Sequence, residues 1–369
     1  MQIDNTYNKN NNNKNNSSSG SNSSINVSTN SGLSANLPGN TLMHDGNLNK
    51  QSGGGNGEIN KISYYPGCSL ESTAIDFNVS IRKLMKVLGI YLEEIPDWNC
   101  CGTTPGHHIS KDMTVDLSAR NLFLAKKTGN DEILSPCVSC YCKLYEAANI
   151  LNDEDAGQTG KNNLKKRGQI IEKFKDFGVI PDEKFNFRIY SIVEYLLNNN
   201  ALVREKYLEL KDSIKEPEKS ILDNMIPVCY YGCVLFRTDY VPRFDSMENP
   251  TSMERVLESA GIKSRDFSFK TECCGAILSL TYKNIVLKLS KKILDTAVEA
   301  GANCIIVCCP LCQQNLDMRQ KQINRFYKTN YKIPVYYISQ VLGMALGLSY
   351  RDVMVDKLFV MPDIKKVRI

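Results

Sequence analysis

The stretch Cys304-Ile-Ile-Val-Cys-Cys309-Pro-Leu-Cys312 joins a short apolar run to a C-x-x-C pair, and the earlier stretch Glu132-Ile-Leu-Ser-Pro-Cys137-Val-Ser-Cys140 has the same form. A short apolar run of this kind is typical of a buried strand. The residues before each run, 115–128 and 285–300, have a helical pattern that stops at a glycine. Strands that alternate with helices of this length indicate βαβ units and hence a parallel sheet.

Two further motifs repeat in the same order around these stretches. Each half opens with a β-type segment that ends in Gly and Cys, which is Ile62-Ser-Tyr-Tyr-Pro-Gly-Cys68 in the first half and Pro227-Val-Cys-Tyr-Tyr-Gly-Cys233 in the second. A predicted helix follows, over residues 75–88 or 252–260. An extended segment, residues 90–98 or 263–271, then leads to Cys100-Cys101-Gly102 or Cys273-Cys274-Gly275. The sequence therefore predicts an internal duplication.

All three cysteine motifs of each half come at the end of a predicted strand. The carboxyl ends of parallel strands meet at one edge of a sheet, which is where sites form in such folds. We therefore expect the cysteines of each half to converge at that edge.

The chain divides into four predicted segments. Residues 1–58 form an Asn/Ser-rich tail whose composition predicts disorder, because it offers too little apolar surface to bury. Residues 59–200 and 225–350 form two repeated domains, with a polar insertion at about 152–180 in the first, and residues 351–369 form a C-terminal extension. The predicted fold class is α/β, with a short, mainly parallel sheet flanked by helices in each domain and pseudo-twofold symmetry between the domains.

The composition, 42% apolar and 23% charged over 369 residues, is that of a soluble globular protein. The sequence has no apolar run long enough to span a membrane, and no charged and apolar leader precedes the first apolar stretch near Ile59. We therefore expect a cytoplasmic protein. The net charge of +5 is small for this length and does not indicate nucleic-acid binding.

Cysteine is unusually common, with 14 residues against three histidines. In a reducing compartment, clustered cysteines are more often metal ligands than disulfides. Cysteines also act as small buried apolar residues, but that role does not explain adjacent pairs beside a glycine in both halves. Zinc is the stronger alternative, although four ligands close a zinc site and each half repeats five thiols. Iron–sulfur clusters contain several irons and take thiolate ligands, so they fit five thiols better.

The predicted ligands form two groups of five. The first cysteine group is Cys68, Cys100, Cys101, Cys137 and Cys140, and the second cysteine group is Cys233, Cys273, Cys274, Cys309 and Cys312. Cys309 is preferred to Cys308 because it stands three residues before Cys312, while the counterpart of Cys308 is Pro136. Cys142, Cys229 and Cys304 fall outside the repeat, and we expect packing roles for them, or a loop thiol in the case of Cys142.

These motifs resemble the CCG-domain family and, within it, the B subunits of the CoB–CoM heterodisulfide reductases of methanogens. The resemblance covers roughly residues 59–350. Beyond the cysteines it includes Tyr230-Tyr-Gly-Cys233, Arg237 and the run Glu248-Asn-Pro-Thr-Ser-Met253. The Asn/Ser-rich tail and the insertion after Cys140 depart from the family pattern, and neither carries a predicted ligand.

The resemblance implies that each cysteine group holds a non-cubane 4Fe–4S cluster. It implies that CoM-S-S-CoB, the mixed disulfide of coenzymes M and B, is cleaved between the two clusters during methanogenesis, with Cys101 and Cys274 as catalytic ligands. Each cluster would supply one electron, since cleavage of a disulfide needs two. The implied partners are two other proteins of the same complex, a ferredoxin-like subunit that feeds this one and a flavin-containing subunit that feeds the ferredoxin-like one.

Three residues outside the cysteine groups are candidates for catalysis or binding. His107 and His108 follow the first CCG triplet and are candidate proton donors to a departing thiolate, with a solvated or capping role as the alternative. Arg237, one helical turn past Cys233, is a candidate to bind an anionic group of the substrate. An ordinary salt bridge with Asp239 or another nearby acid is the alternative for Arg237.

Two other functions remain open on the sequence. The first is an iron–sulfur electron-transfer subunit of a different CCG-containing dehydrogenase, such as one that oxidises a 2-hydroxy acid. The second is a zinc-binding interaction module without enzymatic activity. The sequence has no flavin or nicotinamide motif, so a redox role would require electrons from a partner.

Overall fold

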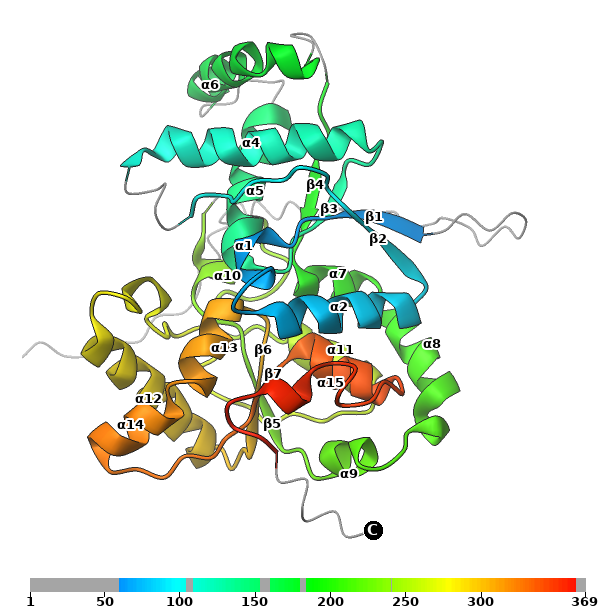
Figure 1. Ribbon diagram of the computed structural model, residues 1–369, viewed down its shortest axis with the longest axis vertical. Coiled ribbons are helices and arrows are strands. Elements are labelled where there is room, and N and C mark those ends of the chain that lie inside the picture. Colours follow the sequence, from blue (N-terminus) through cyan, green and yellow to red (C-terminus); the bar gives the residue numbers. More distant parts are fainter. Residues whose placement is uncertain (1–59, 104–108, 153–159, 180–183, 240, 363–369) are drawn as a thin grey trace, which may run out of the picture. The chain divides into compact units, whose positions relative to one another are not determined.

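Two parallel sheets form the centre of the fold (Figure 1). The computed structural model describes residues 60–103, 109–152, 160–179, 184–239 and 241–362. The first sheet has the strand order β2 (Ile90–Glu94), β1 (Asn60–Tyr64), β3 (Glu132–Leu134) and β4 (Arg188–Tyr190). The second has the order β5 (Pro227–Tyr230), β6 (Cys304–Val307) and β7 (Val335–Tyr337). Every pairing is parallel, which confirms the predicted α/β class.

Helices alternate with the strands in both halves. The helices of the first half are α1 (Gly67–Leu70), α2 (Ile75–Val87), α4 (Lys111–Lys127), α5 (Val138–Asn152), α6 (Gly160–Lys173), α7 (Ile192–Asn198), α8 (Asn200–Leu210) and α9 (Glu218–Asp223). Those of the second are α10 (Val234–Arg237), α11 (Ser252–Ser259), α12 (Lys283–Glu299), α13 (Pro310–Asp317), α14 (Gln320–Tyr327) and α15 (Ile338–Ala345).

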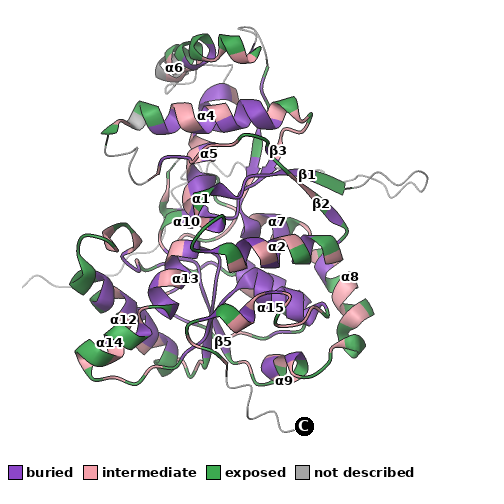
Figure 2. Ribbon diagram, viewed as in Figure 1, coloured by how far each residue is buried: buried purple, intermediate pink, exposed green. Residues whose placement is uncertain are grey.

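Strand β6 shows why the sheets are parallel. All four of its residues are buried, as are those of β5 and β7 (Figure 2). A strand whose side chains are buried on both faces reads as a continuous apolar run, which is what a sheet covered by helices requires. The sequence of β6 has this form.

Both halves belong to one compact unit, residues 57–369, and share one core. Helices α2 and α15 lie side by side between the two sheets (Figure 1). The ring of Phe77 on α2 stacks on that of Tyr337 at the end of β7, with the centroids 4.0 Å apart and the planes 9° apart. Beside the stack, the hydroxyl oxygens of Ser80 and Ser339 lie 2.7 Å apart in the buried interface. Helix α10 of the second half packs against α5 of the first.

The predicted extended segment at residues 263–271 is wrong as a strand. It makes one isolated parallel bridge, between Val228 and Arg265, so β2 has no full counterpart in the second sheet. Lys263, Arg265 and Asp266 are all exposed, so the start of the segment offers no apolar side chain that packs against the neighbouring strand.

Other parts of the chain add to the predicted pattern. The polar insertion contains α6, and the region between the predicted domains contains α8 and α9. Residues 351–362 pack on the second half, where Val353 and Val355 are fully buried. The predicted disordered tail lies outside the described residues, and the proposed domain limits stay predictions.

Candidate functional site

The first cysteine group forms where three neighbouring strands end. Cys68 follows β1, Cys100 and Cys101 follow β2, and the C-x-x-C pair follows β3 at the start of α5. The Sγ atoms of Cys68 and Cys100 lie 3.4 Å apart, as do those of Cys101 and Cys140. Hydrogen bonds also join Cys100 to Cys101 and Cys137 to Cys140. The five thiols therefore form one continuous chain of contacts.

The second cysteine group repeats this arrangement around β5 and β6. The Sγ atoms of Cys274 and Cys312 lie 3.7 Å apart. Hydrogen bonds join Cys233 to Cys273 and Cys309 to Cys312. The neighbouring Cys308 does not take part, since its thiol donates to the backbone oxygen of Tyr231 at 3.7 Å.

A glycine gives the cysteines of each group the room to meet. Gly67 has a φ of +72°, and a β-carbon built there would lie 2.8 Å from Cys140 Sγ. Gly232 has a φ of +76°, and its β-carbon would lie 2.8 Å from Cys312 Sγ. Both the positive φ and the close sulfur exclude any other residue without a local shift. The repeated Gly-Cys motif is therefore a packing requirement of the site.

A buried tyrosine supports each Cys-Cys pair. The hydroxyl of Tyr65 donates to the backbone oxygen of Asn99 at 2.8 Å, and that of Tyr230 donates to the backbone oxygen of Glu272 at 2.7 Å. Each acceptor stands immediately before the adjacent cysteines. Burial, with the nearby thiols, raises the pKa of both tyrosines well above its usual range, so both stay protonated donors.

Each group has a buried part and a part that reaches solvent. Cys68 is exposed, and Cys100, Cys233 and Cys273 are partly exposed, whereas the remaining six predicted ligands are buried. Hydrogen bonds from Cys101 and Cys68 hold the pKa of Cys100 below its usual value, and a hydrogen bond from Cys233 does the same for Cys273. The same hydrogen bonds raise the pKa of Cys68 and Cys233, so in each exposed pair one thiol is favoured as the thiolate, the form of cysteine that binds metals.

The chemistry of the donor atoms is suited to an iron–sulfur cluster. No set of three or more His, Cys, Asp or Glu side chains within the described ranges surrounds a single point as one metal ion would require. The sulfurs of the first group instead run as a chain, and sulfur-only donors in such a number suit a group with several irons. Cys68 is exposed and Cys100 is partly exposed, so both side chains have space to turn outward and make room for a cluster.

The two cysteine groups border the same interface between the halves. The Cys142 thiol lies 3.9 Å from Thr238 Oγ1 and 4.0 Å from the backbone oxygen of Val234, both in the second half. Burial first, and then the charges of Cys137 and Cys309 among others, raise the pKa of Cys142 to about 12. Cys142 is two residues past Cys140 of the first group and Val234 directly follows Cys233 of the second, so both groups border this interface.

The remaining predicted residues lie as follows. Arg237 Nη2 lies 3.2 Å from Thr271 Oγ1 and 3.7 Å from a carboxylate oxygen of Glu272, next to Cys273. Its ion-pair partner is thus Glu272 rather than Asp239. Cys229 and Cys304 are buried in strands. His107 and His108 lie outside the described residues.

Asn315 is a site residue that the sequence interpretation missed. It is buried on α13, and its Nδ2 lies 3.6 Å from Cys274 Sγ and 3.2 Å from the backbone oxygen of Cys274. Its Oδ1 accepts from Arg319 Nε and Ser279 Oγ, each at 3.0 Å. The counterpart in the first half is Lys143, whose Nζ pairs with Glu146. Its place three residues after Cys312 was the only signal in the sequence.

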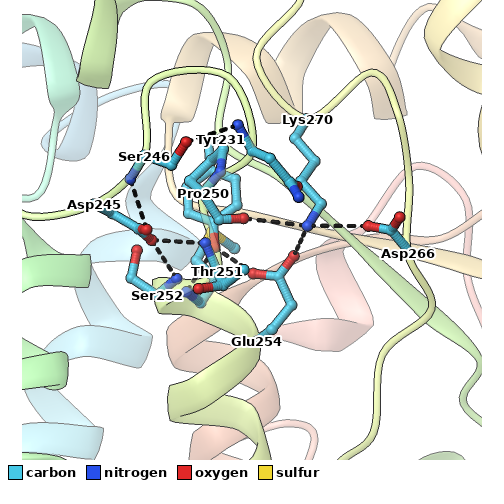
Figure 3. A network of polar contacts seen from close by, with 11 residues as sticks. Tyr231, Asp245, Ser246, Pro250, Thr251, Ser252, Glu254, Asp266 and Lys270 are labelled. Carbon is cyan, nitrogen blue, oxygen red and sulfur yellow. Dashed lines mark hydrogen bonds and ion pairs between the residues drawn. The ribbon is translucent and has the colours of Figure 1, made fainter. Parts of the chain in front are cut away.

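A buried lysine also ties the second site together (Figure 3). Lys270 Nζ makes ion pairs with Glu254 at 2.9 Å and Asp266 at 3.3 Å, and it donates to the backbone oxygen of Pro250 at 3.1 Å. Its own backbone oxygen accepts from the amides of Tyr231 and Gly232. Lys270 thus joins the turn that carries Cys233 to the segment that leads to Cys273.

Comparison with known proteins matches this geometry to a family. The model of the cysteine-rich domain named CCG matches residues 62–145 and again residues 228–317. The chain contains two copies of the CCG cysteine-rich domain. Each match spans the whole of one cysteine group, and the predicted family resemblance is confirmed.

Similar proteins are subunits of several oxidoreductases. The 8-methylmenaquinol:fumarate reductase membrane anchor subunit of Wolinella succinogenes is 29% identical over 79% of this chain and 94% of its own length. The B subunit of the ferredoxin:CoB–CoM heterodisulfide reductase of Methanosarcina mazei is 29% identical over 79% of this chain and 91% of its own. The probable glycolate oxidase iron–sulfur subunit of Bacillus subtilis is 21% identical over 65% of this chain and 44% of its own.

A solved structure supports the fold alone. A hypothetical protein from Helicobacter pylori matches with a TM-score of 0.59 at 16% identity, over 83% of this chain. The present chain covers 53% of the length of that protein. None of the helices in the part of the chain that the structure describes has the length and apolar character that a membrane crossing needs.

Proposed function

We propose that this chain is the iron–sulfur catalytic subunit of a heterodisulfide reductase. It would reduce CoM-S-S-CoB with two electrons and two protons to the thiols of coenzyme M and coenzyme B, as a cytoplasmic enzyme of methanogenesis. The similarity to the Methanosarcina mazei protein supports this proposal. The observation that carries it is the pair of five-thiol groups that border one interface, where Cys142 contacts Val234 and Thr238.

The two groups would hold one non-cubane 4Fe–4S cluster each. When bound, the clusters would supply the two electrons that disulfide cleavage needs. The buried thiols, Cys101, Cys137 and Cys140 in the first group and Cys274, Cys309 and Cys312 in the second, fix each site from within the core. The partly exposed thiols mark the sides from which a disulfide can approach.

Other side chains would bind the substrate and supply its protons. Arg237 lies beside Cys273 with its side chain about half exposed, so it offers a cation to an anionic group of the disulfide. His107 and His108 remain the proposed proton donors. Electrons would come from a ferredoxin-like partner in the same complex, which a flavin-containing partner would in turn supply.

Anaerobic purification followed by iron and sulfide analysis, electron paramagnetic resonance (EPR) and CoM-S-S-CoB reduction by reduced viologen tests the proposal. Cys101→Ser and Cys274→Ser should each remove one of two cluster signals, and each should abolish turnover. Cys304→Ala is the matched control, because Cys304 is buried outside both groups. Turnover that survives the loss of either cluster would contradict the two-cluster mechanism.

An electron-transfer role in another dehydrogenase is a second candidate. The fumarate reductase protein of Wolinella succinogenes is as similar to this chain as the heterodisulfide reductase protein is. In that role both clusters would form and accept electrons, but CoM-S-S-CoB would not be reduced. The same viologen assay therefore separates the two functions.

A further inference from the structure

An apolar loop follows the second CCG triplet and stands out from the surface. We define the apolar loop as residues 276–285, which include the short 3-10 helix η3 (Ala276–Leu278) and the start of α12. Its exposed side chains are Ile277 at 65%, Leu280 at 98%, Tyr282 at 60% and Ile285 at 46%. Large apolar side chains that gather in the open mark an interaction surface more often than single ones do.

The protein holds the apolar loop in a fixed conformation. Ser279 Oγ lies 3.0 Å from Asn315 Oδ1, and Arg319 Nη2 donates to the Ser279 backbone oxygen at 3.0 Å. The amides of Thr281 and Tyr282 donate to the backbone oxygen of Leu278 at 3.1 and 2.9 Å. Leu280 is therefore presented to solvent by a supported turn, so its exposure is built into the fold.

Positive charge borders the loop. Residues 273–292 include Lys283, Lys288, Lys291 and Lys292 and no Asp or Glu. Lys291 pairs with Asp295, whereas no ion pair joins Lys283 or Lys288 to an acid of the described residues, and both are exposed. An apolar centre with a cationic border fits a partner that is apolar at its centre and acidic around it.

The loop also lies directly beside the second cysteine group. It begins after Gly275, whose amide donates to Cys273 Sγ at 3.2 Å. Asn315 contacts both Ser279 of the loop and Cys274 of the group. A partner that docks on the loop is therefore brought close to the second group.

We propose that the apolar loop and the neighbouring lysines of α12 are the docking surface of a small acidic redox protein, which delivers electrons to the second cysteine group. This inference rests on the proposed iron–sulfur function. Transient electron-transfer complexes have small interfaces, which suits a patch of a few apolar side chains and lysines. A membrane surface fits less well, because interfacial binding uses the long apolar face of an amphipathic helix.

Electron delivery by two donors of different size tests the docking surface. The donors are a reduced two-cluster ferredoxin, which is acidic and must dock, and reduced viologen, which need not. The double variant Ile277→Asp and Leu280→Asp should lower kcat/KM for ferredoxin by about tenfold or more and leave the viologen-driven rate unchanged. Both side chains are exposed, so folding should not suffer. Leu208→Asp, at an exposed leucine of α8, is the matched control.

The lysines provide a second readout. Lys283→Glu with Lys288→Glu should lower kcat/KM for ferredoxin and make the remaining rate less dependent on ionic strength, because charge steering raises the association rate. Lys219→Glu on α9 is the control. Direct titration of oxidised ferredoxin by calorimetry reads docking even if the chain reduces no CoM-S-S-CoB, so failure of the proposed function is distinguishable from failure of this surface.

Three results would overturn the inference. The first is an unchanged ferredoxin affinity and rate in the loop variants. The second is an equal loss of the viologen-driven rate, since the loop would then act on the site itself. The third is that the chain binds phosphatidylserine vesicles, that the loop variants abolish this binding, and that their KM for ferredoxin stays unchanged. This result would assign the surface to a lipid.

Discussion

Replacing Gly67 by alanine tests the geometry of the first cysteine group. A β-carbon at this position would lie 2.8 Å from Cys140 Sγ, and only 3% of the surface of Cys140 is exposed. Ordinary contact for such atoms begins at 3.4 Å, so the sulfur or the turn must move by the difference, at least 0.6 Å. Cys140 also contacts Cys101, and a shift would therefore disturb two predicted ligands.

The expected loss of stability has two parts. A left-handed backbone costs a residue with a β-carbon about 1–2 kcal/mol. Overpacking of a filled core adds about 1–3 kcal/mol. Gly67→Ala should therefore lower the free energy of unfolding by about 2–5 kcal/mol and reduce the iron content and EPR signal of the first cluster.

Gly89→Ala is the matched control, because Gly89 has the same φ of +72° but no atom within 4 Å of the added carbon. It should cost only the backbone part, about 1–2 kcal/mol, and keep both clusters. Urea unfolding of both variants, together with iron analysis, measures the difference. If Gly67→Ala is no less stable than Gly89→Ala and keeps the first cluster, then Gly67 does not shape the site as the structure indicates.

Three further outcomes can be measured on the same protein. Tyr65→Phe removes one of the two donors to the backbone oxygen of Asn99, which keeps Asn121 Nδ2, so it should cost about 0.5–1.5 kcal/mol in urea unfolding and alter the EPR signal of the first cluster alone. Asn315→Leu removes an N–H donor to Cys274, which stabilises the more negative, reduced cluster. The reduction potential of the second cluster should therefore fall by about 40 mV in an EPR-monitored titration. This figure takes about 1 kcal/mol for the hydrogen bond and about 59 mV for 1.4 kcal/mol in a one-electron step. Burial raises the pKa of Glu194 from 4.5 to about 7, so its stabilising contribution is present below pH 4.5 and is lost as the pH rises through about 7. The glutamine of Glu194→Gln stays neutral at both pH values. Between pH 5 and pH 8, the free energy of unfolding of this variant should therefore rise relative to that of the unchanged chain by up to about 3 kcal/mol.

The parts of the fold that the sequence predicted correctly depend on local patterns. The helix at Ile75–Val87 and the strand at Cys304–Val307 follow from short runs of apolar residues and the glycines that end them. The convergence of Cys68 with Cys100 follows from parallel strands, whose carboxyl ends must share an edge. Periodicity, spacing and one topological rule were sufficient for these features.

The parts that were missed depend on contacts between distant segments. Residues 263–271 have enough apolar character for a strand, but their place at the sheet edge and their charged side chains leave them with a single bridge. Asn315 and Lys270 are polar residues whose partners, Cys274 and Glu254, are identified only when the chain is folded. No local pattern separates such residues from polar residues on the surface.

The interface between the halves is what makes two cysteine groups more useful than one. Each domain can build its own five-thiol group from its own strands, so the duplication alone does not set the distance between the groups. That distance depends on the stack of Phe77 on Tyr337 and on the buried contact of Ser80 with Ser339. A change that loosened this interface would leave both groups intact but let their separation vary. Because a disulfide accepts its two electrons at two bonded sulfurs, cleavage between two clusters would need a fixed separation. The packed α2–α15 interface would supply this fixed separation, so a variant that loosens it should lower disulfide reduction while both clusters still form.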